Sequence, residues 1–395
     1  MIFKSILDSC PLADPEIWLW ITWSLFWMYE GVHPTHSPEG VRYTSGKEFV
    51  LAGTPLAGGY YCVLWQIRGD LEYMLLTLKL RNYNSNNPCN CCDANSDTHP
   101  WTDARRDVAE WLKHVWTNTS FAERFPDRHL LFKLPGVGIC NWCPDWLHTK
   151  ALGTDAWLFG SVLEMMCSHM LPGNFEQNLE TLRTEILELF EELKTRNRLP
   201  TLTKGMFHRG ASKFPCLKGR GSCIKDFGPV LIRLFDRHVR DRKVGAKDVV
   251  CRVDVRQWVY WALQKAVEMN TLIDEHSRDF CLPTVVAKIF EKDAFRFCGL
   301  IALIGEALHP AGIALFHYTI KFHYLLHIGM IAQYQNPLLG ACHQGEQMMV
   351  VVKRLAASCA RNNNPHQVTN AAMEKYCRAL AFEWMDASTH DLLEE

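Results

Sequence analysis

The sequence lacks an excess of either charge. It contains 42 Lys and Arg residues against 43 Asp and Glu residues, which gives a formal net charge of −1 and a pI near 7.0. A chain with this balance has no overall field that would draw it to nucleic acid or to an anionic membrane, so any such contact must come from a local patch. Composition alone therefore names no partner.

Long apolar runs are also missing. The most apolar windows are Ile17–Met28 and Gly299–Phe316, and the second is interrupted by Glu306 and Pro310. Neither is the uninterrupted stretch of ~18–20 apolar residues that crosses a bilayer. The N-terminus lacks the basic segment and apolar core of a secretory signal. We therefore expect no membrane partner and a reduced, intracellular location.

Apolar residues and cysteines are abundant. With 395 residues, 48% of them hydrophobic, the chain can bury a sizeable core. Sixteen cysteines in a reduced compartment are more often metal ligands or buried thiols than disulfides.

The residue pattern predicts an α+β chain that is mostly helical. Tyr60–Ile67 is short, aromatic and β-branched, as is typical of a strand. Helical periodicity covers most of the chain after residue 150, and an amphipathic helix is expected over 103–117. We expect four segments: a partial sheet-bearing core (1–81), a Cys-rich module (82–150), a helical insertion (151–308) and a C-terminal helical region (309–395).

Two Cys-x-x-Cys pairs are candidate metal ligands. The first is Cys89 and Cys92, and the second is Cys140 and Cys143. The two-residue spacer lets both sulfurs of a pair face one ion, so the two pairs could supply four thiolates to a tetrahedral structural Zn²⁺. The alternative is that these are unliganded buried thiols. A redox role has less support, because no thioredoxin-like βαβ pattern surrounds either pair.

Histidines offer further ligands. His99 or His148 could replace one thiol in the zinc site. His323 and His327 stand at i and i+4 in KFHYLLHIG and could bind a metal, although an isolated pair of this kind is more often part of the core. Asp145 and His148 also share one helical face, with a helix N-cap and a core histidine as the alternative.

Two acids and a basic loop complete the candidates. Asp70 directly follows the predicted strand, where it could hold a metal or cap the next helix. Glu346 begins a helical stretch and favours its N-terminal dipole. Lys213, Lys218 and Arg220 lie near glycines and could follow a phosphate backbone, but the loop lacks the Walker spacing.

Four segments, in this order, resemble the transposases of CACTA-type DNA transposons, and more closely the multi-copy transposase-like proteins of unicellular algae. They are FVLAGTPLAGGYYCVLWQIRGDLEYM followed by PCNCC, then DWLHTKALG followed by LFGSVL, then FPCLKGRGS, and finally KFHYLLHIGMIAQYQNPLLGACHQGEQMMVVVKRL. Each motif is short, so the order of the set is more specific than any member.

The resemblance implies a partial RNase H-like sheet, with three carboxylates around divalent metal. Asp70 would be the second acid and Glu346 the third, with Asp145 and His148 as a supporting box. In such DDE-type enzymes Mg²⁺ or Mn²⁺ activates a water that attacks a DNA phosphodiester, and the freed 3′-hydroxyl then attacks target DNA. The implied partner is DNA and the implied location is the nucleus, with a homo-oligomer left open.

The family's first acid is not identified here. Only 48 residues precede Phe49, and the nearest candidates, Asp8 and Asp14, match no family motif. The expectation is a truncated or inactive copy of the transposase. The alternative is a non-enzymatic nuclear module, in which zinc orders the Cys pairs and basic loops hold DNA or a protein. A third reading is a zinc hydrolase that uses Asp145 and His148.

Overall fold

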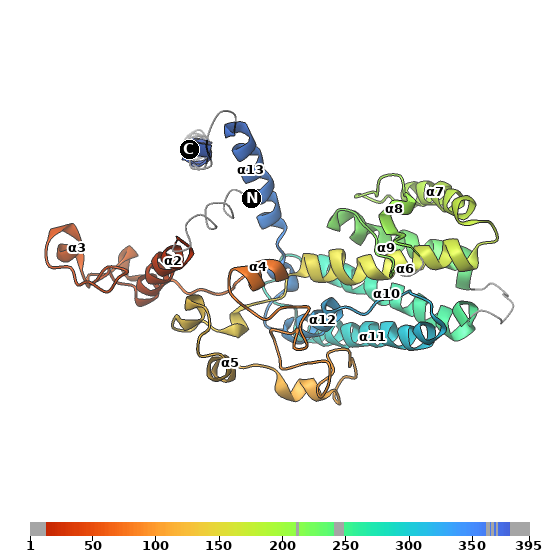
Figure 1. Ribbon diagram of the computed structural model, residues 1–395, viewed down its shortest axis with the longest axis horizontal. Helices are drawn as coiled ribbons and strands as arrows, with labels where there is room; N and C mark the ends of the chain where they lie inside the picture. Colours follow the sequence, from red (N-terminus) through yellow and green to blue (C-terminus); the bar gives the residue numbers. More distant parts are fainter. Residues whose placement is uncertain are drawn as a thin grey trace. The chain divides into compact units, whose positions relative to one another are not determined.

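The structure is a computed structural model that describes residues 13–210, 213–240, 249–360, 364, 367–368 and 370–379. The chain is mostly helical, as predicted (Figure 1). It divides into two compact units. Unit 1 comprises Met1–Leu64, His129–Val137 and His343–Glu395, and unit 2 comprises Trp65–Arg128 and Gly138–Cys342.

Unit 1 is built from short helices and extended loops. In helix α2 the indole of Trp18 packs edge-on against His129, with 4.6 Å between ring centroids. Among the residues that the structure describes, this unit contains α2 (Ala13–Glu30), α3 (Gly46–Leu51), η1 (Ala57–Gly59), η3 (Leu130–Lys133) and α13 (His343–Cys359), and residues 370–379 are also helical.

Unit 2 is a helical bundle with a loop-rich module at its side. The long helix α11 (Thr284–Leu308) packs on α10 (Val253–Glu275) and on α12 (Ile320–Ile331), and α10 also packs on α9 (Gly221–Phe235) (Figure 1). The remaining elements are α4 (Leu71–Leu76), η2 (Glu110–His114), α5 (Asn118–Arg124), η4 (Ile139–Asn141), η5 (Leu147–Asp155), α6 (Ala156–Met165), η6 (Met166–Met170), α7 (Phe175–Glu192), α8 (Lys204–Phe207), η7 (Asp236–Arg240), η8 (Val249–Cys251), η9 (His309–Ala311) and η10 (Pro337–Gly340).

Helix α11 is apolar around much of its circumference. The stretch Thr284–Ala311 is long and apolar enough, by length and composition, to cross a membrane. Here it packs between α10 and α12, and Phe290, Phe297 and Ile304 on it are fully buried. A helix in the core of a bundle has the same composition, because it is apolar on every side that touches a neighbour.

The predicted strand at Tyr60–Ile67 is not formed. This segment is extended coil in which Tyr60, Tyr61 and Trp65 are exposed, and Ile67 forms an isolated bridge to Trp142. A strand is stabilised by a partner ladder, and the described residues contain isolated bridges but no strand. The prediction of a partial sheet is therefore wrong for the described part of the chain.

The predicted helix over 103–117 is also much shorter than expected. Only Glu110–His114 is helical, as a 3₁₀ turn, and turns precede it. Its fully buried Trp111 donates from its indole nitrogen to the carbonyl of Asp103 at 2.7 Å. This contact folds the stretch back on itself, so burial of one side chain overrides the helical pattern of the whole segment.

Candidate metal centre and the adjoining cleft

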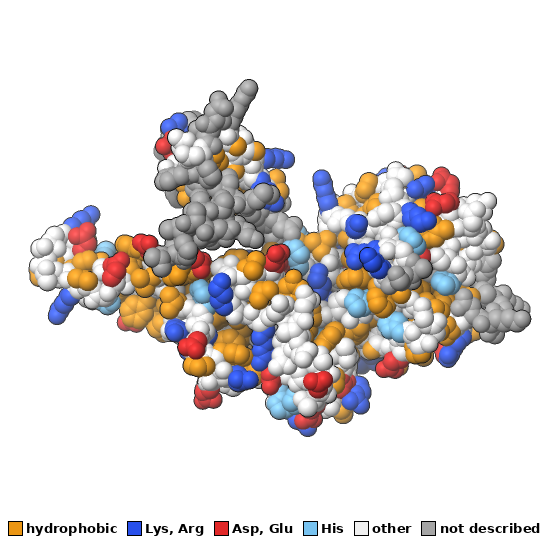
Figure 2. All heavy atoms as spheres, in the orientation of Figure 1, with side chains coloured by type: hydrophobic (Ala, Val, Ile, Leu, Met, Phe, Trp, Pro, Cys, Tyr) orange, Lys and Arg blue, Asp and Glu red, His pale blue; other side chains and the backbone are white. Residues whose placement is uncertain are grey.

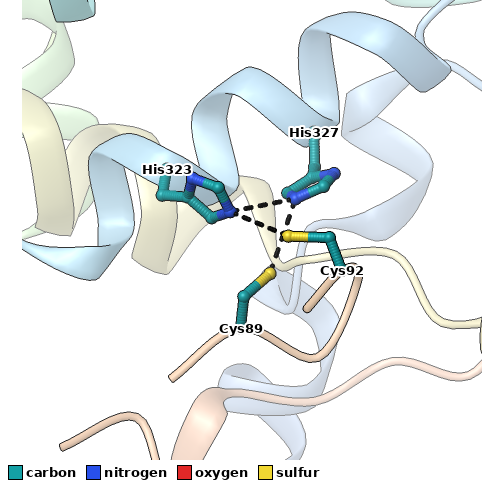
Figure 3. Close-up of side chains that lie close together, drawn as sticks. All are labelled: Cys89, Cys92, His323 and His327. Carbon is teal, nitrogen blue, oxygen red and sulfur yellow. Dashed lines mark hydrogen bonds between the residues drawn. The ribbon is translucent and has the colours of Figure 1, made fainter. Parts of the chain in front are cut away.

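Two of the predicted ligand pairs meet in unit 2. Cys89 and Cys92, from the Cys-rich loop, face His323 and His327 of helix α12 (Figure 3). The four side chains, which we call the Cys2His2 group, are 0%, 0%, 0% and 3% exposed, respectively. The loop and the helix are more than 230 positions apart in the sequence, so this group ties together distant parts of the chain.

The geometry of the Cys2His2 group fits a tetrahedral zinc ion. Cys89 Sγ lies 3.4 Å from His327 Nε2, Cys92 Sγ lies 3.3 Å from His323 Nε2, and the two Nε2 atoms are 3.1 Å apart. With Zn–S near 2.3 Å and Zn–N near 2.0 Å, tetrahedral ligands lie about 3.3–3.8 Å from one another. Small movements of the side chains are therefore enough to close the group around one ion.

Backbone and side-chain contacts shape the loop that carries the two thiols. The amide of Cys91 donates to Cys89 Sγ at 3.2 Å, and the amide of Ala94 donates to Cys92 Sγ at 3.4 Å. Such amides stabilise a thiolate in the way that outer partners of a metal site commonly do. The Arg81 guanidinium also donates to the carbonyls of Cys89 and Cys92. These hydrogen bonds hold the loop in place without a metal ion.

Helix α12 presents the two imidazoles because they stand one turn apart on its buried side. On the same helix, the Tyr324 hydroxyl accepts a hydrogen bond from the Asn90 amide at 3.2 Å and donates one to Pro88 O at 3.1 Å. These two hydrogen bonds link the helix to the Cys loop. Trp111 covers the imidazoles, with its ring 4.5 Å from that of His323 and 5.0 Å from that of His327. The group is therefore shut off from water.

Burial shifts the pKa of two of these ligands, His323 and Cys92. It lowers the pKa of His323, against opposing effects from Cys89 and the Trp101 backbone, and it raises the pKa of the Cys92 thiol well above the ordinary value. The imidazole is therefore neutral, as metal ligation requires. Two sulfur and two nitrogen donors without an open position are typical of structural zinc.

The second Cys pair does not join this group, which corrects the prediction of a four-thiolate site. Cys140 is exposed, with its sulfur 3.8 Å from Trp116 O. Cys143 is buried against the backbone of Gly340, and burial raises the pKa of its thiol to about 12. The two sulfurs of this pair have different surroundings because η4 (Ile139–Asn141) ends between them. His99 and His148 are also outside the Cys2His2 group.

A cleft of about 640 Å³ opens beside the Cys2His2 group within unit 2. Its wall includes Pro88, next to Cys89, and Lys321, two residues before His323. These two lining residues therefore belong to the two segments that the Cys2His2 group joins. The other residues that line it are Gly69, Asp70, Leu71, Glu72, Tyr83, Asn84, Ser85, Asn86, Ser96, Trp101, Asp145, His148, Thr149, Trp157, His317, Tyr318, Thr319 and Ile320.

Asp145 and His148 form a pair at the wall of this cleft. His148 Nδ1 is hydrogen-bonded to Asp145, whose side chain is only 2% exposed, and amides of Leu147 and Cys342 donate to Asp145 Oδ1 at 3.0 and 2.9 Å. Burial raises the pKa of Asp145, but the hydrogen bonds from His148 and these amides outweigh it and hold the pKa of the carboxyl below its usual value. The carboxylate is thus ionised and fully engaged.

Asp70 lines the same cleft, as the N-cap of helix α4. Its carboxylate accepts from the Tyr73 amide at 2.7 Å, which is the capping role that the sequence had left open. Lys321 lies nearby and donates to Leu152 O at 3.0 Å. Burial lowers the pKa of Lys321, and the charges of Cys216, Asp145 and Asp70 oppose that shift. Two acids of the resemblance and one half-buried amine therefore share this cleft.

The other predicted residues are not brought to the cleft by any described contact. Glu346 lies on α13 in unit 1, and its side chain is outside the described residues. Asp8 also lies outside them, and Asp14 is on α2 of unit 1. The basic candidates Lys213, Lys218 and Arg220 are all exposed in unit 2.

Sequence reasoning found both halves of the Cys2His2 group but did not join them. The Cys-x-x-Cys spacing and the i, i+4 histidines are each weak signals, and nothing in the sequence links one to the other across more than 230 positions. A comparison with protein-family models, with curated proteins and with solved structures finds nothing that matches this chain. Function is therefore inferred from the Cys2His2 group and the cleft.

Proposed function

We propose that this chain is a transposon-derived homologue of DDE-type DNA transposases, with a structural zinc ion on the Cys2His2 group and a divalent-cation site in the adjoining cleft. The observation that carries the proposal is the meeting of Cys89 and Cys92 with His323 and His327. These pairs come from two of the four motifs on which the resemblance rests. Chance similarity of short motifs gives no reason for them to converge in space.

The other two motifs lie in the same unit and contact each other, which supports the proposal. The first motif brings Asp70 to the cleft and the DWLHTKALG motif brings Asp145 and His148. In the FPCLKGRGS motif, the amide of Leu217 donates to Ala156 O at 2.8 Å, directly after η5. Parts of all four motifs therefore lie in unit 2, whereas the first motif up to Leu64 and the last motif from His343 belong to unit 1.

The cleft residues would have distinct roles in such a protein. Asp70 offers a carboxylate at the start of a helix, and a divalent cation bound there would supply an activated water and stabilise the leaving oxygen. Asp145 orients His148 at the wall through the Nδ1 hydrogen bond. Lys321 would offer a half-buried amine to a phosphate bound in the cleft. Glu346 is proposed as the third acid from the resemblance alone.

Plasmid nicking tests the catalytic part. The purified chain, loaded with zinc, is incubated with supercoiled DNA and Mg²⁺ or Mn²⁺, and the open-circular product is measured. The resemblance implies a truncated or inactive copy, so the first question is whether the chain nicks DNA at all. In an active copy, Asp70→Asn should lose at least about 100-fold, because this change removes a metal-binding charge. Asn is an equally good N-cap, so helix α4 is kept. Glu346→Gln should behave alike, whereas Asp97→Asn, an exposed acid outside the cleft, should retain activity.

Equal nicking by all of these variants would refute the catalytic assignment. An absence of nicking by the zinc-loaded wild-type chain would also refute it, and would favour the second candidate function. This candidate is a non-enzymatic module that binds DNA through its exposed basic loop. The specific observation in its favour is the exposure of Lys213, Lys218 and Arg220.

Salt dependence tests that second candidate. If the loop contacts phosphates, Lys218→Ala and Arg220→Ala should each weaken DNA binding for all sequences alike and lower the slope of log K against log salt by about 1. On the face of unit 2 drawn in Figure 2, Lys and Arg side chains are interspersed with Asp and Glu, so binding through a broad basic field is not expected. Lys113→Ala, in the exposed part of η2, is a matched control.

A further inference from the structure

A second group of metal-ligand side chains lies outside the cleft. His99, Glu110 and His114 offer ligand atoms that all lie within 4.8 Å of one another, and all three side chains are half-buried. The centroids of the two imidazole rings are 4.1 Å apart, and the ring planes are tilted by 51° to each other. Glu110 Oε1 lies 3.9 Å from His114 Nε2, while Lys113 pairs with the other oxygen, Oε2, at 2.8 Å. One carboxylate oxygen is thus directed at the histidines.

The backbone holds these three residues in place without a metal. Asn95 Oδ1 accepts from the amides of Asp97, Thr98 and His99 at 2.8, 2.7 and 3.1 Å, which closes a tight turn in front of His99. His99 Nδ1 lies 3.1 Å from both Asn95 Nδ2 and Thr98 Oγ1, so its ring has one orientation. A preformed arrangement lowers the entropy cost of binding an ion.

The second pair of ligands is fixed through the core. Glu110 and His114 are the two ends of η2, and the residue between them that anchors this turn is Trp111. Trp111 is fully buried and packs on the imidazoles of the Cys2His2 group, so the same short turn covers one metal group and carries the ligands of the other. The carbonyl of His114 also accepts from the Asp93 amide at 3.0 Å, next to Cys92.

We propose that His99, Glu110 and His114 form a second metal site, for a borderline divalent cation such as Zn²⁺. Two imidazoles and one carboxylate are ligands that zinc prefers, and three protein ligands leave a fourth position for water or for a partner's side chain. Because this site is half-exposed and has no thiolate, it exchanges its ion faster than the Cys2His2 group. The assignment does not depend on the nuclease proposal.

Metal stoichiometry with two probes tests this site. Bound Zn²⁺ is measured by equilibrium dialysis, and Co²⁺ substitution reports separately on thiolate ligands through sulfur-to-cobalt charge-transfer absorption. We expect the double variant His99→Gln/His114→Gln to bind about one equivalent less metal than the wild type. Its thiolate absorption should be unchanged. The matched control is His33→Gln/His276→Gln, which replaces two half-buried histidines outside both groups.

Glu110→Gln gives a second, milder variant with less risk to the fold, since this side chain is 46% exposed. It should lower the affinity for the metal ion that binds without thiolates by about tenfold or more, because it removes the charged ligand. Equal stoichiometry and affinity in the wild type and these variants would overturn the proposal. Loss of thiolate absorption in the folded double variant would do so as well, because the metal lost would then be the one on the Cys2His2 group.

Discussion

At the residue scale, the four ligands of the Cys2His2 group are the most consequential side chains. Each is buried, and each lies within reach of a ligand from the other chain segment. Metal bound to such a group contributes its binding free energy to folding, because the unfolded chain has no preformed site. With a metal bound, the group would act as a cross-link whose strength depends on that metal.

Substitution of one ligand should show that the stability of the chain depends on the bound metal. We expect Cys89→Ser and His327→Gln to lose the tightly bound zinc and to lower the stability of the chain by several kcal/mol, a fall in Tm of roughly 10 °C or more. Zinc content and calorimetry measure both effects. Cys281→Ser replaces an exposed thiol and is the control. Zinc content and Tm that are unchanged in Cys89→Ser would contradict this role.

The pair of Asp145 and His148 makes a prediction about pH. The folded pKa of Asp145 lies below its unfolded value, so the pair stabilises the fold above about pH 4, and this contribution is lost as pH falls through the folded pKa. Asp145→Asn should therefore cost about 1–3 kcal/mol at neutral pH and flatten the acid limb of the stability curve. Urea unfolding between pH 3 and 7 measures this, with Asp97→Asn as the control. If the stability of Asp145→Asn depended on pH in the same way as that of the wild type, the pair would not stabilise the fold as described.

At the element scale, the π-helix η5 shows why local pattern was insufficient. DWLHTKALGTD has a helical pattern, but Asp145 lies just before the helix, where its side chain accepts from the Leu147 amide and is hydrogen-bonded to His148. What could not be predicted is that Lys150 and Asp155 are fully buried and pair at 2.5 Å. Lys150 also donates to Ala266 O at 2.9 Å, which pins η5 to helix α10. Only the fold brings that acceptor to the lysine.

That buried ion pair yields a prediction for the element. Lys150→Met should destabilise the chain by about 3–5 kcal/mol, because it leaves the Asp155 carboxylate buried beside Asn270 without its cation. Lys150→Met/Asp155→Leu should recover most of that loss, since no uncompensated charge remains. Chemical denaturation of the single and double variants measures the free energy of interaction between residues 150 and 155. A double variant as unstable as the single one would show that the pair contributes more than charge compensation.

The long helices were predictable, whereas the loop-rich segments were not. The helical periodicity that the sequence shows after residue 150 is confirmed in α7 and α11, because apolar periodicity directly encodes a buried face. Tyr60–Ile67 failed because a strand depends on partners that lie elsewhere in the chain. The Cys-x-x-Cys pair and the i, i+4 histidine pair could be recognised because their spacing is local in the sequence. Which pair meets which depends on the tertiary fold, so it could not be predicted.

At the scale of the whole molecule, the Cys2His2 group joins the start and the end of unit 2 in the sequence. The Cys loop lies near the beginning of Trp65–Cys342 and helix α12 near its end, with α6 to α11 between them. The cleft draws its walls from both ends. The integrity of the cleft should therefore depend on the metal, and any activity in it should be lost when zinc is removed.

The ligand sphere of the tightly bound metal tests this account most directly. X-ray absorption at the zinc edge, on the chain loaded with one equivalent of Zn²⁺, should show two sulfur scatterers near 2.3 Å and two imidazole nitrogens near 2.0 Å. Four sulfur scatterers, as the two Cys-x-x-Cys pairs alone would give, or a sphere without sulfur, would contradict the Cys2His2 assignment.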